Sequence, residues 1–272
     1  GCFFEMMGDD GINIKGHFAY IVDVIGDEVI IAARNVSAIQ QGDTLQLLDG
    51  DTINLLGTVT VERVQQVYDA QWVAKAGQMW EGKLGSTASV VLRARLVDTE
   101  VRIQAGDLVV SLDRAGRGAV IRDCTIRGNR ARGMLIKAPE ALIENNTFDS
   151  ISLGGITIMP ELQWMEGPIP YGVVIRGNRF TNMGVSDPVH LQRIPHGGSA
   201  IAVLVLDSYG SPEKSRAIQD IVIEENVFEN SAVIDITVRN VSKASIRNNT
   251  GADGSPTTRI QVAASEDVIL DS

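Results

Sequence analysis

The sequence is poor in cysteine and in basic residues, and it has no long hydrophobic run. Cys2 and Cys124 are its only cysteines, and two cysteines do not form a disulfide framework. No apolar run approaches the roughly 18 residues that a membrane helix needs, so we expect no membrane insertion. The 24 Lys and Arg residues stand against 34 Asp and Glu, a formal net charge of −10. This balance argues against a general nucleic-acid binder and is compatible with a neutral ligand such as a sugar.

The chain also lacks an initiator Met and a signal peptide, although a strong motif follows only a few residues after Gly1. We therefore expect an N-terminally incomplete or processed chain, whose missing signal says nothing about secretion. Its 272 residues, 44% of them hydrophobic, are enough to bury a sizeable core.

The sequence does contain a repeat. The aligned segments are IRDCTI (121–126), IENNTF (143–148), IRGNRF (175–180), IEENVF (223–228) and IRNNTG (246–251). Asn fills the fourth place in four of them, as Asn146, Asn178, Asn226 and Asn249, and Cys124 fills it in the first. Such units with short β-branched strands indicate a solenoid, in which stacked Asn amides satisfy one another at an inward turn. We predict an all-β fold, a right-handed parallel β-helix (a pectate-lyase-like solenoid).

Residues 17–115 interrupt this pattern. Their strands alternate with period two, and Gly26-Asp27 and Asp49-Gly50 mark hairpin turns. Residues 2–16 align with 124–138 without a gap, so one coil resumes directly after another. We therefore predict that 1–16 and 116–272 form the β-helix and that 17–115 form an inserted antiparallel β-barrel-like domain.

The run GDDGINIKG (8–16) places Asp9 and Asp10 together just before a strand. Coils stack about 4.8 Å apart, so the alignment puts Arg132 one coil from Asp10. Adjacent carboxylates raise each other's proton affinity and a nearby Arg lowers it, which separates an acid from a base. A glycosidase needs such a pair of carboxyl groups. Asp9 and Asp10 are therefore the candidate catalytic residues, although ordinary turn chemistry also explains them, and a solvated surface position also explains Arg132.

Further candidates line the same face. An insertion at 160–172 carries Trp164, a flat apolar face for a sugar ring, and Glu166, an acceptor for sugar hydroxyls. Trp164 could equally plug the loop against the solenoid. Asn13 points away from its apolar neighbours and faces either the cleft or a polar ladder. A second insertion at 185–198 carries His190 and His196, whose spacing is no established metal signature, and we expect no metal.

Three motifs together resemble glycoside hydrolase family 110. They are GDDGINIKG followed by an inserted β module, GDLVVSLDRA…IRDCTIRGNRARGMLIKA, and W-x-E-G before IRGNRF. The family comprises bacterial exo-acting α-1,3-galactosidases, built on a right-handed β-helix with inserted β-barrel modules. The resemblance implies cofactor-free hydrolysis of terminal α-1,3-linked galactose with inversion, in a secreted or periplasmic protein.

The resemblance also implies roles for residues. Asp9 and Asp10 match the family's paired acids, without an assignment of acid and base, and Trp164 and Glu166 match a sugar-binding segment. Lys15 stands where a His is expected in the relatives, which places it in the substrate site with Asn13 and Arg132. The resemblance further implies an acid from a preceding coil, and we expect that coil to belong to the missing N-terminal part of the protein.

Two other interpretations of the function are open. A non-catalytic carbohydrate-binding or structural β-helix, of the adhesin or tailspike kind, would carry the acids as solvated turn residues. A Ca²⁺-dependent polysaccharide lyase would use acidic metal ligands and a base such as Lys15 or Arg132. The partner expected in the leading reading is a glycan, without nucleic acid, and a homodimer is compatible with the fold although no residue argues for it.

Overall fold

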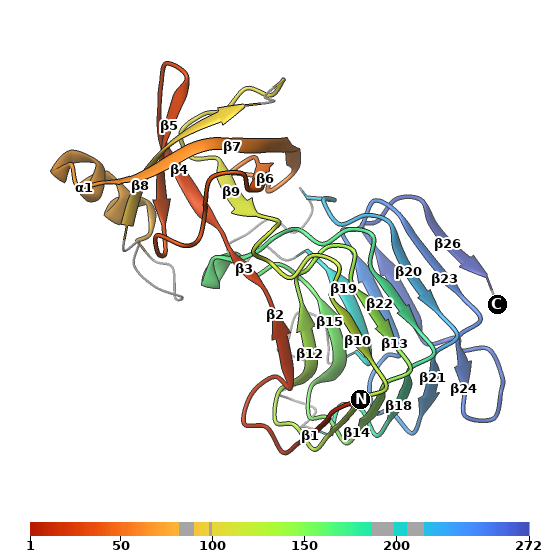
Figure 1. The fold of residues 1–272 in the computed structure, drawn as a ribbon. Coiled ribbons are helices and arrows are strands. Elements are labelled where there is room, and N and C mark those ends of the chain that lie inside the picture. Colours follow the sequence, from red (N-terminus) through yellow and green to blue (C-terminus); the bar gives the residue numbers. More distant parts are fainter. Residues whose placement is uncertain (82–89, 98–99, 186–198, 206–214, 272) are drawn as a thin grey trace.

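Three parallel β-sheets form the walls of a solenoid in the computed structural model of the protein (Figure 1). The structure describes residues 1–81, 90–97, 100–185, 199–205 and 215–271. The first sheet contains β1 (Phe3–Glu5), β11 (Thr125–Arg127), β14 (Thr147–Asp149), β18 (Arg179–Thr181), β21 (Val227–Glu229) and β24 (Thr250–Gly251). The second contains β10 (Val120–Arg122), β13 (Leu142–Glu144), β17 (Val174–Arg176), β20 (Ile221–Glu224), β23 (Ala244–Arg247) and β26 (Val268–Asp271). The third contains β2 (Ile12–Ile14), β12 (Arg132–Ile136), β15 (Gly154–Ile158), β19 (Ile201–Leu204), β22 (Ile236–Arg239) and β25 (Ile260–Ala263).

The register of the first two coils is the one that the ungapped alignment predicts. Phe4 pairs with Ile126 and Asn13 pairs with Leu135, both in parallel strands. The polar–apolar alternation of these strands therefore points one set of side chains into the solenoid and the other set outward. The predicted parallel β-helix is confirmed.

A ladder of asparagine side chains runs through the same turn of four successive coils, at Asn146, Asn178, Asn226 and Asn249. The Oδ1 atom of Asn178 accepts hydrogen bonds from the backbone N–H of Asn146 at 2.9 Å and from its Nδ2 at 3.0 Å. Asn226 and Asn249 continue the pattern, each accepting from the Asn of the preceding coil. The residue before each Asn is left-handed, as at Gly177 with φ 63°. These bonds satisfy buried polar groups that would otherwise destabilise the turn.

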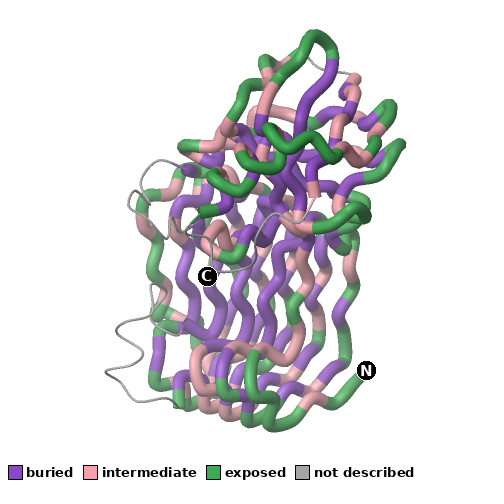
Figure 2. The backbone as a smooth tube through the Cα atoms, turned by 90° about the vertical axis from the view of Figure 1, so that its left-hand side faces the viewer, coloured by how far each residue is buried: buried purple, intermediate pink, exposed green. Residues whose placement is uncertain are grey.

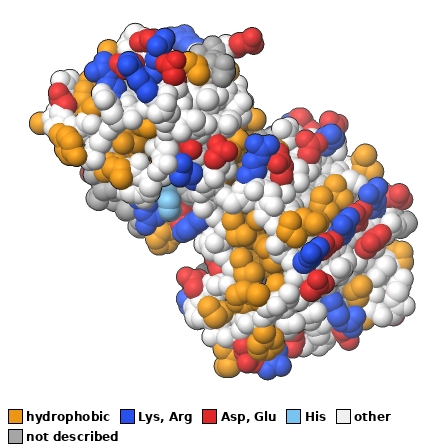
Figure 3. Space-filling view, in the orientation of Figure 1, with side chains coloured by type: hydrophobic (Ala, Val, Ile, Leu, Met, Phe, Trp, Pro, Cys, Tyr) orange, Lys and Arg blue, Asp and Glu red, His pale blue; other side chains and the backbone are white. Residues whose placement is uncertain are grey.

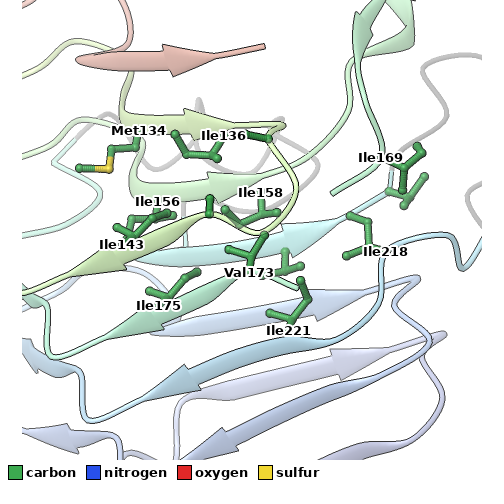
Figure 4. Packing of buried hydrophobic residues seen from close by; sticks show 14 of the residues in the cluster. Met134, Ile136, Ile143, Ile156, Ile158, Ile169, Val173, Ile175, Ile218 and Ile221 are labelled. Atoms are coloured by element: carbon green, nitrogen blue, oxygen red, sulfur yellow. The ribbon is translucent and has the colours of Figure 1, made fainter. Parts of the chain in front are cut away.

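Apolar side chains fill the space between the three sheets. Figure 4 shows Met134, Ile136, Ile156 and Ile158 in this interior, and Figure 2 shows the buried strands as parallel stretches along the solenoid. Phe148 and Phe180 stack with ring centroids 4.8 Å apart and planes at 5°. A Cβ at Gly155 would lie 2.5 Å from the Phe180 ring, so the glycine makes room for the stack.

The outer surface of the second sheet carries a row of alternating charges beside a strip of apolar side chains (Figure 3). Its members in coil order are Arg122, Glu144, Arg176, Glu224, Arg247 and Asp271. The Arg176–Glu144 and Arg247–Glu224 pairs close at 2.9 Å and 2.7 Å. Each guanidinium is about half exposed, so these pairs contribute little to stability.

A closed antiparallel barrel lies beyond the carboxyl end of β2 (Figure 1). Its strands in order are β4 (Ala19–Ile25), β5 (Glu28–Ala33), β8 (Val90–Val97), β7 (Leu55–Val67), β6 (Thr44–Leu48) and β9 (Leu108–Ser111). The predicted inserted barrel is confirmed as an architecture, while the division at residues 16 and 116 stays a prediction. A helix, α1 (Ala70–Met79), lies within the stretch predicted to be a β module, and the Asp69 side chain accepts hydrogen bonds from the backbone N–H groups of Gln71 and Trp72.

The insertion at 160–172 ties the two modules together. Its short 3-10 helix η1 (Leu162–Trp164) leads into β16 (Glu166–Gly167), which pairs antiparallel with β3 (Gly16–His17). The Gln46 side chain of the barrel exchanges two buried hydrogen bonds with the backbone of Ile169, at 3.1 Å and 2.8 Å. The insertion is therefore fixed against both the first coil and the barrel.

Candidate functional site

The outer faces of β2 and β12 bring the predicted site residues together. Ile12 and Ile14 point inward, so Asn13 and Lys15 point outward. The neighbour of Asn13 in the next coil is Leu135, so Asn13 belongs to no amide ladder and is exposed on this face.

Asp10 is held by Arg132 of the next coil, as the stacking argument predicts. The guanidinium donates through Nε to Oδ1 at 2.8 Å and through Nη2 to Oδ2 at 3.1 Å. The backbone N–H of Arg132 adds a third bond to Oδ1 at 3.2 Å. The two side chains are only 17% and 7% exposed, for Arg132 and Asp10 respectively. Asp9, by contrast, is exposed, so the two aspartates stand in different environments.

A hairpin from the insertion places two more carboxylates over these strands. The backbones of Glu161 and Glu166 exchange hydrogen bonds at 2.9 Å and 3.0 Å, and Met165 between them is left-handed with φ 54°. Glu161 accepts from Nη1 of Arg132 at 3.2 Å and from Nζ of Lys137 at 3.0 Å. The fold of the hairpin thus directs its acids toward the basic residues of the solenoid.

Glu166 lies between two lysines. Its Oε2 accepts from Nζ of Lys137 at 2.8 Å, and its Oε1 accepts from Nζ of Lys15. Burial acts to raise the pKa of Glu166, but the hydrogen bonds and charges of Lys137 and Lys15 outweigh it, and the pKa lies below its usual value. Glu166 is therefore ionised at neutral pH, with both oxygens bonded to ammonium groups.

These contacts form one continuous series of alternating charges, which we call the charge chain. Its members in order are Asp10, Arg132, Glu161, Lys137, Glu166 and Lys15. The three acids balance the three bases, which is the condition for burying Lys137, whose side chain is 0% exposed. Arg132 keeps a pKa above its usual value, because its bonds to Asp10 and Glu161 outweigh the effect of burial.

Sequence reasoning missed two members of the charge chain, Glu161 and Lys137. A signal was present, because Lys137 occupies the same outward position as Lys15 one coil away. Two lysines stacked on neighbouring strands require countercharges, and the insertion at 160–172 carries two glutamates.

The remaining candidates lie around the charge chain. Trp164 ends η1 within the hairpin, between Glu161 and Glu166, and is 45% exposed. It is therefore accessible to a ligand rather than buried as a plug. His190 and His196 lie outside the described residues. Among the residues that the structure does describe, no three His, Cys, Asp or Glu side chains are grouped to hold a metal ion.

The arrangement can bind a polyhydroxylated ligand on an electrostatically fixed surface. Asp9, Asn13 and Trp164 offer an exposed carboxylate, an amide and an aromatic face, while the charge chain holds the strands and hairpin that carry them.

Nothing in the described ranges forms a helix long and apolar enough to cross a membrane.

Comparison with known proteins points to carbohydrate-active relatives. No family model matches the chain. It is 26% identical over 234 residues to an alpha-1,3-galactosidase B of Akkermansia muciniphila, covering 83% of the chain and 26% of that protein. It is similar to two proteins of that name from Phocaeicola vulgatus, 25% identical over 91% of the chain and 27% identical over 83% of it. The chain spans only 41% and 37% of those two relatives. These similarities support the resemblance to glycoside hydrolase family 110.

Proposed function

We propose that the protein is a glycoside hydrolase that releases terminal α-linked galactose, most simply α-1,3-linked, from a glycan. The observation that carries the proposal is the Asp10–Arg132 pair on the outer face of β2 and β12, with exposed Asp9 beside it in the chain. The names of the similar proteins support the same substrate class. Action outside the cytoplasm, in the periplasm or after secretion, belongs to this proposal.

In the proposed reaction, Asp9 and Asp10 supply the two carboxyl groups that inversion needs. One protonates the departing glycosidic oxygen, and the other takes a proton from the water that attacks the anomeric carbon from the opposite face. Arg132 fixes Asp10 through three hydrogen bonds, so this carboxylate is oriented before substrate binds. The exposed position of Asp9 leaves its carboxyl free to approach a sugar.

The proposed substrate contacts follow from exposure. Trp164 stacks against the apolar face of the sugar ring, and Asn13 bonds a hydroxyl from the outer face of β2. Glu166, Lys15 and Arg132 each have partners within the charge chain. They form a polar surface beneath the sugar. Each of them bonds a sugar hydroxyl only through atoms that its ion pairs do not already use.

Aspartate-to-asparagine variants test this proposal. We expect Asp9→Asn and Asp10→Asn each to lower kcat/KM for galactose release from α-1,3-galactobiose by about 10²–10⁴-fold. Asp51→Asn, at an exposed acid in a barrel turn, is the matched control and should stay within twofold of the wild type, on the order of experimental scatter. Equal activities in all four proteins contradict the assignment of the aspartates.

One observation favours a second candidate, a β-helix that only binds carbohydrate. The carboxylates of Asp10, Glu161 and Glu166 are all in ion pairs with Arg or Lys side chains. Such pairs favour a rigid surface that binds a ligand without taking part in proton transfer. Binding of galactobiose without release of galactose, unchanged in Asp10→Asn, is the result expected of that candidate. The lyase alternative gains no such support, because both of its candidate bases, Lys15 and Arg132, lie in ion pairs.

A further inference from the structure

A cavity of about 320 Å³ lies where the first coil meets the barrel. Lys15 and Gly16 line it from the end of the first coil, and His17 lines it where the inserted module begins. The loop after β5 contributes Asn35 and Ser37, and the end of β9 and its following turn contribute Ser111 and Arg114. Both modules are therefore required to build it. It adjoins the charge chain at Lys15, whose ammonium bonds to Glu166 on the other side.

The side chains that line the cavity include bases and hydrogen-bond donors but no acid. Six of the eight lining residues carry hydrogen-bond donors, three of these are basic side chains, and none is an acid. This composition contrasts with a chain of net charge −10. The countercharges of the lining, Glu166 for Lys15 and Asp43 for Arg114, do not line the cavity.

Buried Ser111 and half-buried His17, which both line the cavity, favour a ligand that accepts hydrogen bonds. Ser111 is 2% exposed, and its Oγ has no hydrogen-bond partner in the described structure. His17 receives a contact from Nη1 of Arg34, 3.2 Å from its Nδ1. Burial, Arg34 and Lys15 lower the pKa of His17, against an opposing effect of Glu166. The imidazole therefore sits in a positive local field that an anion would relieve.

We propose that this junction cavity binds an oxyanion group, a sulfate ester or a carboxylate, carried by the glycan that the protein acts on. An oxyanion offers acceptors to the ammonium of Lys15, the guanidinium of Arg114 and the unpartnered hydroxyl of Ser111 together. A neutral sugar brings no negative charge to this donor-rich lining. Only the identity of the carrier as a galactose-containing glycan rests on the proposed function; the binding of the oxyanion does not.

Proton NMR of the histidine ring signals tests the proposal. The His17 signal is assigned by its loss in His17→Gln, and the protein is titrated with sodium sulfate, and separately with sodium galacturonate, at constant ionic strength maintained with sodium chloride. We expect a saturable shift of the His17 signal and an increase of its pKa with at least one of the two anions. Saturation by sulfate alone identifies a sulfate ester as the group, and saturation by galacturonate identifies a carboxylate. A shift that follows ionic strength alone overturns the proposal.

A charge introduced into the lining provides the matched variant. Ser37 is exposed in its loop, so Ser37→Asp should fold normally, and it should weaken anion binding about tenfold or more. Ala252→Asp adds the same charge to an exposed turn of the last coil and should leave binding unchanged. Undiminished binding by Ser37→Asp also overturns the proposal. Anion binding by a protein that releases no galactose would refute the proposed hydrolase alone, and galactose release without anion binding would refute the subsite alone.

Discussion

The ammonium group of Lys137 lies 2.8 Å from Oε2 of Glu166, in a side chain with no exposed surface. It also contacts Glu161 at 3.0 Å, so a single buried cation joins both strands of the hairpin to the solenoid. Burying a charge in this way is tolerated only while its partners remain. The position of the hairpin, and of Trp164 within it, therefore depends on Lys137.

We expect Lys137→Met to destabilise the protein by about 3–5 kcal/mol, the usual cost of removing one partner from a buried ion pair, since Glu161 then keeps only Arg132 and Glu166 only Lys15. Adding Glu166→Gln should recover part of the loss, because one of the two glutamates that lost a cation is then neutral. Urea denaturation measures both. Lys243→Met removes an exposed pair with Asp220 and should cost less than about 1 kcal/mol. A loss for Lys137→Met no larger than that control would contradict the account.

Arg132→Lys tests whether the two parallel hydrogen bonds from the Arg132 guanidinium orient the carboxylate of Asp10. A lysine keeps the charge but cannot donate to both carboxylate oxygens in parallel, so Asp10 loses its fixed orientation. We expect kcat for galactose release to fall about 10–100-fold, with a smaller change in KM. Arg247→Lys, in the exposed row on the second sheet, should leave both parameters unchanged. An equal effect in the two variants would show that the bidentate geometry is irrelevant.

Asn178→Ala interrupts the asparagine ladder at its centre. It leaves the backbone N–H and the Nδ2 of Asn146 without their buried acceptor, at a cost of about 3 kcal/mol in the free energy of unfolding. Asn230→Ala removes an exposed amide contact with Asn182 and should cost less than about 1 kcal/mol. Chemical denaturation measures the free energy of unfolding of the two variants. Similar losses of stability in both would mean that the ladder does not stabilise the turns.

The lowered pKa of His17 predicts a pH dependence of stability. Burial contributes most to this lowering of the pKa, followed by the positive charges of Arg34 and Lys15. Below the ordinary histidine value of about 6.5, the unfolded chain binds a proton that the folded chain does not, so stability falls as pH drops toward the folded-state pKa. The wild type should lose stability relative to His17→Gln over this range, in chloride buffers free of sulfate and phosphate. A stability difference between the two proteins that is constant from pH 7.5 to pH 5, on the order of one histidine titration range, would refute the prediction.

Much of the fold follows from the sequence because a solenoid is periodic. The recurring Asn at 146, 178, 226 and 249 fixes the same turn in four coils, and the ungapped match of the first two coils fixes their register. From that register alone, Arg132 is expected beside Asp10, and the structure brings them together. Periodicity converts sequence spacing directly into spatial neighbours.

The hairpin at 161–166 obeys no such period. Its place depends on the pairing of β16 with β3 and on the contact between Gln46 and Ile169, both of which join segments far apart in the sequence. Sequence reasoning found Trp164 and Glu166 there by motif, but not that two lysines would hold Glu166 or that Glu161 would bridge Arg132 and Lys137. The helix α1 was missed for a related reason, since it lies in a connection between barrel strands rather than in a repeat.

The most direct test of the account is proton NMR of the protein incubated with α-1,3-linked galactobiose, recorded before mutarotation equilibrates the released sugar. We expect β-galactose to appear first, because hydrolysis of an α-galactoside with inversion releases the β-anomer. Release of α-galactose first, or of no galactose at all, would contradict it.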